Sequence, residues 1–287
     1  MGRDLVIWEI FANFASLKIQ NLTLPEILKS KPTNFLVFAV TDDELNNISS
    51  RDSRISFNEA DHSYVVDGKT LISVTTLIDN YFERFDPVAT ATKKAHRLGI
   101  DPDVLINEWK HKGEESRQLG TELHANIERY YKGNTVAYNA PEWVFFLDFA
   151  RDYNLEPIRS EWTIFDEDYG VSGTLDFICR HNGELTLFDW KRSEKLIDPK
   201  TGIELRENRF HRNGHKPISH VSDTPYYRYA LQVNMYAYFL SEKYGIEVKR
   251  LKLAVFHPTN SQYYVIELPI MRKEVIDILK HHKANAK

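Results

Sequence analysis

The stretch GTLDFICRHNGELTLFDWKRS, residues 173–193, decides the fold of this chain. Its two runs of alternating apolar residues flank Asn182 and Gly183, and an Asn-Gly pair in that position is the strongest short signal for a β-hairpin. With these two residues as the loop, the register places Asp176 directly opposite Asp189, with Cβ atoms about 4.5–5.5 Å apart. The most strand-like part of the chain therefore carries two opposed carboxylates.

A lysine accompanies the two aspartates. Side chains alternate along a strand, so Lys191 is expected on the same face as Asp189, with Thr174 as its partner across the hairpin. Two opposed carboxylates repel each other, and burial strengthens the repulsion. Lys191 relieves it in part, and a divalent cation bound by oxygen ligands relieves it better. Taken alone, the hairpin fits a metal site and a structural Asp–Lys–Asp ion network equally well.

The composition is that of an ordinary globular protein. The 287 residues are 42% hydrophobic and carry a formal net charge of -4, so any site for a polyanion must be a local basic patch. Cys179 is the only cysteine, which excludes a disulfide framework and any cysteine-rich metal or iron–sulfur cluster. No apolar run has the length of a transmembrane helix, and the N-terminus does not resemble a signal peptide. We therefore expect a cytoplasmic protein, in the host cytoplasm if it is phage-encoded, without membrane contact.

Periodic patterns along the chain predict an α/β fold. Residues 55–79 alternate like a hairpin around Asp67 and Gly68, and residues 87–133 have a helical pattern with Thr121 as a candidate N-cap. The remaining predicted elements are, in order, a helix over 140–154, strands over 159–165, 171–180 and 184–191, a helix over 226–244, strands over 249–257 and 262–268, and a helix from about residue 272. This order predicts helices packed on a mixed β-sheet.

Four short motifs together resemble one known family. GTLD, residues 173–176, is followed by DWK, residues 189–191, as in the PD-(D/E)XK nucleases. The closest match is their RecB-like branch, which includes the mitochondrial genome maintenance exonuclease and phage exonucleases. That branch also has a Gly-x-x-x-His helix before the strands and a Gln-x-x-x-Tyr helix after them, and residues 120–124 and 232–236 have these patterns. The resemblance covers about residues 55–268.

The resemblance implies a fold and a domain organisation. The expected fold is α/β with a restriction-endonuclease-like core, a helix, three strands, a helix and a strand around a mixed sheet, at about residues 118–268. This core lies within a nuclease domain of residues 51–287 that carries a helical insert. Residues 1–50 form a small N-terminal extension of unknown role. The segment between DWK and the Gln-x-x-x-Tyr helix is longer than the family pattern.

The resemblance also implies a metal centre. In this family, the aspartates that match Asp176 and Asp189 bind a divalent metal together with the histidine that matches His124. The main-chain carbonyl of the residue at Trp190 usually joins them. Oxygen ligands with one imidazole suit Mg²⁺ or Mn²⁺, and the single cysteine implies a member without an iron–sulfur cluster. Lys191 would orient or deprotonate the attacking water and stabilise developing negative charge.

Other candidate residues flank this centre. Glu161 precedes the hairpin, where RecB-like nucleases often have an acidic residue near the metal, although a solvated charge is also consistent with its position. Gln232 and Tyr236 share one helix face and could reach the phosphate or Lys191, or could be polar rim positions of an amphipathic helix. Glu128 follows His124 by one helical turn. It is a weaker candidate for a residue that contacts the ligand His124 without contacting the metal itself.

Substrate contacts should come from local cations, given the net acidity. The segment 195–224 is either a mobile basic arm over bound DNA or a solvated loop. Its candidate DNA-binding residues are Lys195, Lys200, Arg206, Arg209, Arg212 and Lys216, and weaker candidates in the preceding helical region are Lys93, Lys94 and Arg97.

The sequence thus predicts a metal-dependent deoxyribonuclease acting on single-stranded DNA or duplex ends. By family analogy it is an exonuclease in DNA processing, recombination or repair. The alternatives are a structure-specific or restriction-type endonuclease, a catalytically inactive nucleic-acid-binding module, and a structural α/β protein whose acidic hairpin binds a cation such as Ca²⁺.

Overall fold

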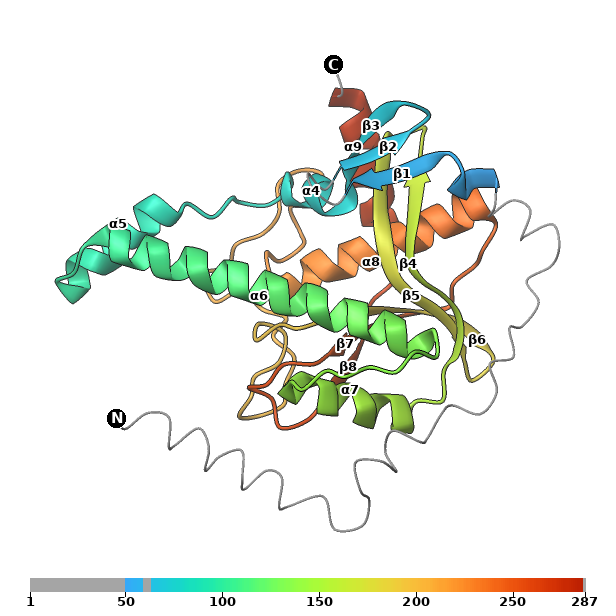
Figure 1. Cartoon of the computed structure of the whole chain (residues 1–287). Helices are drawn as coiled ribbons and strands as arrows, with labels where there is room; N and C mark the ends of the chain where they lie inside the picture. The colour runs from blue at the N-terminus through green and yellow to red at the C-terminus, as the bar shows by residue number, and fades with distance from the viewer. Residues whose placement is uncertain (1–49, 59–62, 286–287) are drawn as a thin grey trace, which may run out of the picture.

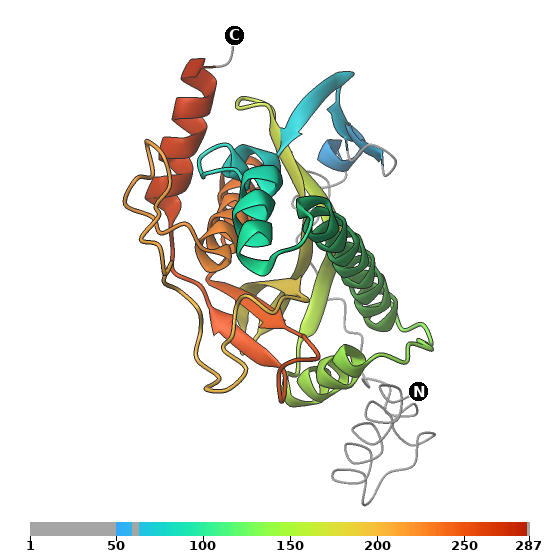
Figure 2. The ribbon, with the colours of Figure 1, turned by 90° about the vertical axis from the view of Figure 1, so that its left-hand side faces the viewer.

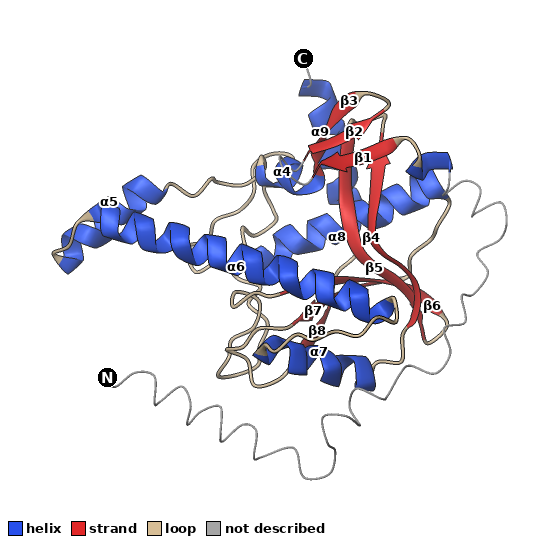
Figure 3. Cartoon of the chain, viewed as in Figure 1, coloured by secondary structure: helices blue, strands red, loops and turns tan. Residues whose placement is uncertain are grey.

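The computed structural model describes residues 50–58 and 63–285, so the predicted extension of residues 1–50 lies outside the described residues except for Ser50. The described chain forms an eight-stranded mixed sheet with helices on both faces, an α/β fold as predicted (Figure 1, Figure 3). Its elements, in chain order, are β1 Ile55–Asn58, β2 Ser63–Val66, β3 Lys69–Ser73, α4 Val74–Asp79, α5 Pro87–Leu98, α6 Pro102–Tyr131, α7 Pro141–Asp152, β4 Glu156–Asp166, β5 Val171–His181, β6 Glu184–Lys191, α8 Pro225–Tyr244, β7 Arg250–Val255, β8 Tyr264–Glu267 and α9 Arg272–Asn285.

The strand β5 organises the sheet because its two edges have different neighbours. β4 pairs antiparallel along almost the whole of one edge, and both strands are long and strongly curved (Figure 3). On the other edge, β3 pairs in parallel with Val171 and Ser172, whereas β6 pairs antiparallel with residues 177–181. Residues 173–176 therefore have no strand partner on that edge within the described part of the chain. This opening in the sheet contains the GTLD motif.

The hairpin of β5 and β6 has the predicted loop and the predicted register. His181 pairs with Glu184, and the loop residues Asn182 and Gly183 have φ angles of 52° and 81°. Two residues with positive φ form the type I′ turn that an Asn-Gly loop favours.

The ladder between β5 and β6 ends one step before the two aspartates. Its last pair is Phe177–Phe188, and Asp176 accepts a hydrogen bond from the backbone N–H of Trp190 rather than lying in a ladder pair with Asp189. The strands separate here because β5 turns toward β3 while β6 continues along β7. Thr174, predicted opposite Lys191, instead lies within hydrogen-bonding distance of the hydroxyls of Tyr64 and Thr163.

Two local predictions are wrong. Residues 74–79 were expected to continue a strand but form α4, because the Ser73 side chain caps a helix by accepting the N–H of Thr76. Thr121 lies inside α6 rather than at its start, and Asp101 caps this helix in its place.

Two hydrophobic clusters cover the two faces of the sheet. On one face, α6 and α7 pack against aromatic side chains of the sheet, with Phe146, Phe149 and Trp190 fully buried. On the other face, α4, α8 and α9 pack against aliphatic strand residues around Phe239 and Leu253. The central strands β5, β6 and β7 are therefore mostly buried, whereas β1 at the edge of the sheet is largely exposed.

A helical arm extends from the body of the protein (Figure 1). It consists of α5 and the first half of α6, which pack through Ala91, Ala95 and Leu105. Gly99 ends α5 in the left-handed conformation, with a φ of 66°, so the helical region predicted over 87–133 is two helices. The second half of α6 lies over the sheet and carries His124.

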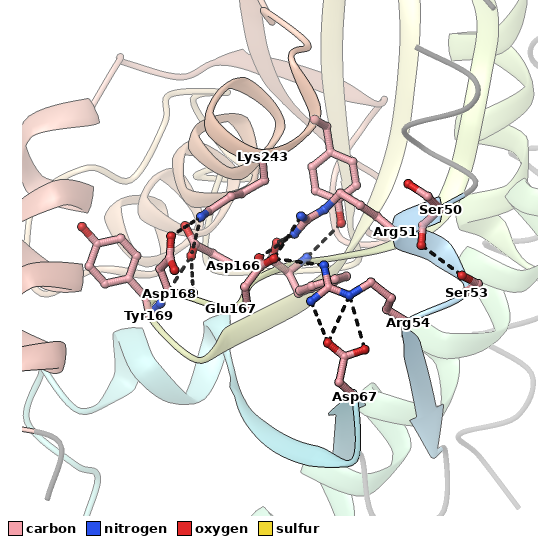
Figure 4. Close-up of polar contacts among 12 residues, drawn as sticks. Ser50, Arg51, Ser53, Arg54, Asp67, Asp166, Glu167, Asp168, Tyr169 and Lys243 are labelled. Atoms are coloured by element: carbon pink, nitrogen blue, oxygen red, sulfur yellow. Dashed lines mark hydrogen bonds and ion pairs between the residues drawn. The ribbon is translucent and has the colours of Figure 1, made fainter. Parts of the chain in front are cut away.

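A polar network fixes the turn between β4 and β5 (Figure 4). Arg51 donates to both carboxylate oxygens of Glu167, over 3.2 and 2.8 Å, and Arg54 pairs with the same carboxylate at 3.1 Å. Lys243 of α8 pairs with Asp168 at 2.5 Å on the other side of the turn. These contacts tie the segment before β1 and the end of α8 to one end of β5.

Candidate metal centre

His124 of α6, Glu161 of β4 and Asp176 of β5 converge on one point. One ligand atom from each of the three side chains lies within 4.8 Å of the others. His124 Nδ1 is 3.5 Å from Glu161 Oε1 and 3.6 Å from Asp176 Oδ1. Two carboxylates and an imidazole in this arrangement could hold a metal ion.

The backbone orients Asp176. Its Oδ2 accepts a hydrogen bond of 2.7 Å from the N–H of Trp190, which leaves Oδ1 facing His124. The side chain is buried, and burial raises the pKa of Asp176 against the opposing effect of the positive charges on His124 and Lys191. A buried carboxylate with one oxygen fixed and the other directed at a second ligand is suited to cation binding.

Glu161 enters the centre through an unusual backbone conformation. Its φ is 46°, and its neighbours in β4 pair with the neighbours of Asp176, so the two carboxylates lie across the ladder from each other. Leu175 and Ile178 belong to one core cluster and Phe177 to the other, which means that the alternation of faces along β5 shifts at Asp176. A left-handed residue other than glycine costs about 1–3 kcal/mol and is found at functional sites.

The second ring nitrogen of His124 faces the backbone. Nε2 lies 3.0 Å from the carbonyl oxygen of Trp190. Burial alone would lower the pKa of His124, but the carboxylates of Asp176 and Glu161 outweigh it and raise the pKa to about 9. Without a cation, the ring is therefore protonated at neutral pH, and a metal ion would replace that proton.

Asp189 and Lys191 form a buried ion pair beside the centre. Lys191 Nζ is 2.5 Å from Asp189 Oδ2 and lies 4.5 Å from the centre of the Tyr229 ring. Burial and the charge of Asp176 raise the pKa of Asp189 to about 6. Burial by itself lowers the pKa of Lys191, but Asp189 and Asp176 outweigh it and raise the pKa, so the ammonium stays charged.

One oxygen of Asp189 is buried without a hydrogen-bond partner in the described part of the chain. Asp189 is 2% exposed, and its Oδ1 has no hydrogen-bond partner among the described residues. Buried polar atoms without a partner are uncommon and need an explanation. Asp189, predicted as a metal ligand, is not one of the three side chains that converge on the candidate metal position, and its other oxygen pairs with Lys191.

Gln232 and Tyr236 lie under the centre on α8. Gln232 Nε2 donates to Tyr236 Oη over 3.1 Å, and both side chains are buried, so they are not solvent-exposed rim positions. Burial is the main reason that the pKa of Tyr236 is raised, and the charges of Asp189 and Asp176 add to it. The hydroxyl thus remains protonated and polar next to the two aspartates.

Two neighbours of Lys191 were not anticipated from the sequence. Tyr229 precedes Gln232 by three residues and Tyr236 by seven, so helical spacing places it on the same face and could have identified it. The ion pair between Arg192 and Glu142 at the start of α7 has no such signal. It is 2.5 Å long, and Glu142 is 1% exposed.

The segment 195–224 is anchored to the protein body. Leu196, Ile197, Ile218 and Val221 are buried in the core beside α8, which a freely solvated loop would not permit. The predicted DNA-binding residues lie along its outer side, where Lys195, Lys200, Arg206, Arg209, Arg212 and Lys216 are exposed.

Some of these cations already have local partners. Arg206 pairs with Glu204 at 2.5 Å, and Arg212 pairs with Glu83 at 2.9 Å. On α5, Lys93, Lys94 and Arg97 are exposed. Glu128 pairs with Lys132 at 2.6 Å, so it does not support His124 as the sequence suggested.

Comparison with known proteins adds little to these observations. No known protein family matches the sequence, and no curated protein matches it. Seventeen chains of solved structures match, among them the crystal structure of SSO0001, with 15% sequence identity over 85% of this chain and 84% of the other and a TM-score of 0.34. Similarity at that level carries no argument about function.

The fold and the site together define a class of protein. The chain is a mixed α/β protein in which the half-buried His124 and Glu161 and the buried Asp176 form a group that could hold a metal ion. Within the described residues, no helix is both long enough and apolar enough to cross a membrane.

Proposed function

We propose that this protein is a divalent-metal-dependent deoxyribonuclease that hydrolyses phosphodiester bonds. The observation that carries the proposal is that two distinct charged groups lie next to each other where the pairing of β5 with β6 ends. His124, Glu161 and Asp176 surround one point, and the buried Asp189–Lys191 pair lies beside it. A cation site next to a fixed ammonium group suits a reaction in which negative charge develops on a phosphate.

We also assign the core to the restriction-endonuclease-like fold of the PD-(D/E)XK nucleases, as part of a nuclease domain of residues 51–287. Supporting this assignment, α6, the three strands β4 to β6, α8 and β7 occur in the order that the motifs imply, with α7 between α6 and β4. The motif residues of α6, β5, β6 and α8 also lie around the one opening in β5.

The cofactor that fits best is Mg²⁺ or Mn²⁺. Carboxylate oxygens from Glu161 and Asp176, with one imidazole nitrogen from His124, are donors that these ions accept. The Trp190 carbonyl, predicted as a further ligand, instead lies 3.0 Å from the other ring nitrogen of His124, Nε2. Asp189, predicted as a ligand, would complete the set from the Lys191 side. When bound, such an ion supplies charge neutralisation at the scissile phosphate and activation of water.

The side chains of the chain have separate tasks in this proposal. Lys191, whose pKa is raised by Asp189 and Asp176, would donate to a phosphate oxygen or orient the attacking water. Asp189 and the ring of Tyr229 hold its ammonium group in place. Gln232 and Tyr236 form a hydrogen-bonded support beneath the two aspartates.

We assign exonuclease activity in DNA processing, recombination or repair, from the resemblance to RecB-like exonucleases. The same arrangement of charges can serve a structure-specific or restriction-type endonuclease. The alternative without enzymatic activity is a catalytically inactive nucleic-acid-binding module. The presence of the Asp189–Lys191 pair argues against this alternative.

The test compares three DNA substrates in Mg²⁺, in Mn²⁺ and in a chelator. They are end-labelled single strands, end-labelled duplexes and a covalently closed circle. The proposal predicts mononucleotides or short products from the linear substrates in metal only, and intact circles. Lys191→Ala and Asp189→Ala should each lose activity by at least two orders of magnitude, as expected for groups that stabilise transition-state charge.

Lys280→Ala, an exposed lysine of α9, is the matched control and should keep full activity. Cleavage of the circle would replace the exonuclease assignment by an endonuclease. No cleavage in either metal would favour the binding module, and full activity of Asp189→Ala would refute the assignment of the site.

A further inference from the structure

Two phenylalanines project far into solvent. Phe85, between α4 and α5, is 67% exposed, and Phe210, in the segment 195–224, is 78% exposed. Phe85 also contacts Trp109 of α6, with ring centres 5.8 Å apart. No requirement of the fold explains their exposure, because neither side chain belongs to a core cluster of the described residues.

A cation lies beside two of these three rings, Phe210 and Trp109. The guanidinium carbon of Arg212 lies 5.6 Å from the centre of the Phe210 ring, and Lys94 Nζ lies 5.6 Å from the centre of the Trp109 ring. Both distances are within the range of cation–π contacts. We call these five side chains, Phe85, Lys94, Trp109, Phe210 and Arg212, the aromatic surface.

An ion pair joins the two chain segments that carry Phe85 and Phe210. Arg212 pairs with Glu83, two residues before Phe85, at 2.9 Å. The segment with Phe210 is thereby joined to the connection between α4 and α5 and to the base of the helical arm. In Figure 2 the arm, with α5 in teal, points toward the viewer.

Two further ion pairs join elements next to the aromatic surface with elements next to Lys191. Lys112, one turn after Trp109, pairs at 3.0 Å with Glu194, which follows Lys191 by three residues. Arg228 pairs with Asp79 at 2.7 Å, and its neighbour Tyr229 contacts the Lys191 ammonium. The helix that carries Trp109 is thereby joined to the segment that follows Lys191, and the helix that carries Tyr229 is joined to the end of α4.

We propose that the aromatic surface binds the unpaired bases of a single-stranded polynucleotide that leads into the site. Exposed rings alternating with cations are how proteins hold single strands, since each base stacks on a ring and each phosphate pairs with a cation. A duplex hides the faces of its bases and offers nothing to stack on Phe85 or Phe210. The inference rests on the proposed nuclease function for its direction into the site, but the binding itself does not require cleavage.

The test measures binding by the full-length protein in a chelator, so that no cleavage occurs. The probes are a fluorescent thymidine oligonucleotide of about 16 nucleotides and a duplex of the same length, followed by fluorescence anisotropy. Phe85→Ala/Phe210→Ala should weaken single-strand affinity roughly tenfold or more for each lost stack and leave duplex affinity unchanged. Arg212→Gln should reduce the slope of log affinity against log salt by about 0.7.

Ile270→Ala is the matched control, because Ile270 is 68% exposed and lies outside the aromatic surface. It should leave both affinities unchanged. The proposal is overturned if the double variant binds the single strand as wild type does, if both probes lose affinity equally, or if wild type binds no single strand. The last outcome would leave a protein partner as the occupant of this surface.

A substrate without bases separates this inference from the proposed function. Hydrolysis of bis(4-nitrophenyl) phosphate in Mn²⁺ needs the metal centre but no stacking. The double variant should hydrolyse this ester as wild type does. If wild type does not hydrolyse the ester while its single-strand binding depends on the two phenylalanines, the nuclease function is wrong and the proposed role of the aromatic surface is supported. If wild type hydrolyses the ester but its single-strand binding does not depend on the two phenylalanines, the proposed role of the aromatic surface is wrong and the nuclease function is supported.

Discussion

Gly173 lies so close to the ring of Tyr236 that a Cβ atom at this position would be 2.8 Å from Tyr236 Cε1. Gly173 belongs to the stretch of β5 that has no strand partner on one edge, and α8 fills that space with Tyr236. Since Tyr236 is 3% exposed and bonded to Gln232, its ring cannot move away. The glycine of the GTLD motif therefore lets α8 approach the two aspartates.

Gly173→Ala should accordingly destabilise the protein by about 1–3 kcal/mol, as for other overpacked cores. Chemical denaturation measures the change. In a Tyr236→Leu background the added cost should be much smaller, because the clashing atoms are gone. Gly113→Ala is the control: its Cβ would meet nothing within 4 Å, and a helical alanine should stabilise by about 1 kcal/mol. Equal costs of Gly173→Ala in both backgrounds would contradict this explanation.

The left-handed conformation of Glu161 predicts an unusual order of stabilities. Glycine adopts a φ of 46° without strain, whereas alanine does not. In a chelator, Glu161→Gly should therefore be more stable than Glu161→Ala by about 1 kcal/mol. At Thr163, two residues further along β4 and extended, the order should reverse, because glycine weakens a strand. Thermal melting of the four variants measures these differences in stability. If glycine is more stable than alanine at both positions, or at neither, the backbone of Glu161 is not strained.

The buried ion pair of Arg192 and Glu142 joins α7 to the end of β6, next to Lys191. Arg192→Ala should cost about 3–5 kcal/mol, because it leaves the Glu142 carboxylate buried without a partner. Arg192→Met/Glu142→Gln should cost clearly less than that single change. For comparison, Arg250→Ala breaks an exposed pair with Glu184 and should cost at most about 1 kcal/mol. Urea titration of these variants tests the prediction, which fails if the double variant is the least stable.

The sequence predicted those parts of the site that depend on local patterns. Asn182 and Gly183 determine the turn, and the turn determines the register of the hairpin up to Phe177. The helical spacing of Gln232 and Tyr236 predicted a shared face, and the structure joins them by a hydrogen bond.

Other parts of the site depend on features that no local pattern contains. Period-two alternation cannot place Glu161, because its left-handed backbone and the change of face at Asp176 interrupt that period. Nor does any spacing connect Arg192 with Glu142, fifty positions apart. The helix α4 replaced a predicted strand because one capping side chain, Ser73, outweighs the β-branched residues that follow it.

The network in Figure 4 predicts a dependence of stability on pH. Burial alone would raise the pKa of Glu167, but the hydrogen bonds from Arg51 and Arg54 outweigh it and lower the pKa from 4.5 to about 2. A lowered pKa means that the contribution to stability is complete above pH 4.5 and is lost as the pH falls toward 2. Glu167→Gln should thus melt at a lower temperature than wild type at pH 7, and the gap should close below pH 4.5.

Calorimetry over this pH range measures the gap. Glu115→Gln, an exposed glutamate of α6, should melt as wild type does throughout. A gap of constant size between pH 7 and pH 2 would mean that Glu167 acts through packing and not through its charge.

Metal binding can be separated from chemistry by its effect on melting. Mn²⁺ at a hundred times its Kd should stabilise wild type by about 2.7 kcal/mol. Asp176→Asn should remove that stabilisation and yet raise the melting temperature in a chelator. Burial disfavours the charged carboxylate of Asp176, so a neutral amide that still accepts the Trp190 N–H costs less. These opposite signs cannot come from a variant that is merely misfolded.

Lys191→Met should keep the full Mn²⁺ response while losing nuclease activity, because it removes a positive charge beside the centre and no ligand. Asp148→Asn, on α7, should behave as wild type in both conditions. If Asp176→Asn retains the Mn²⁺ response, the cation binds elsewhere, and the three converging side chains are a structural ion network.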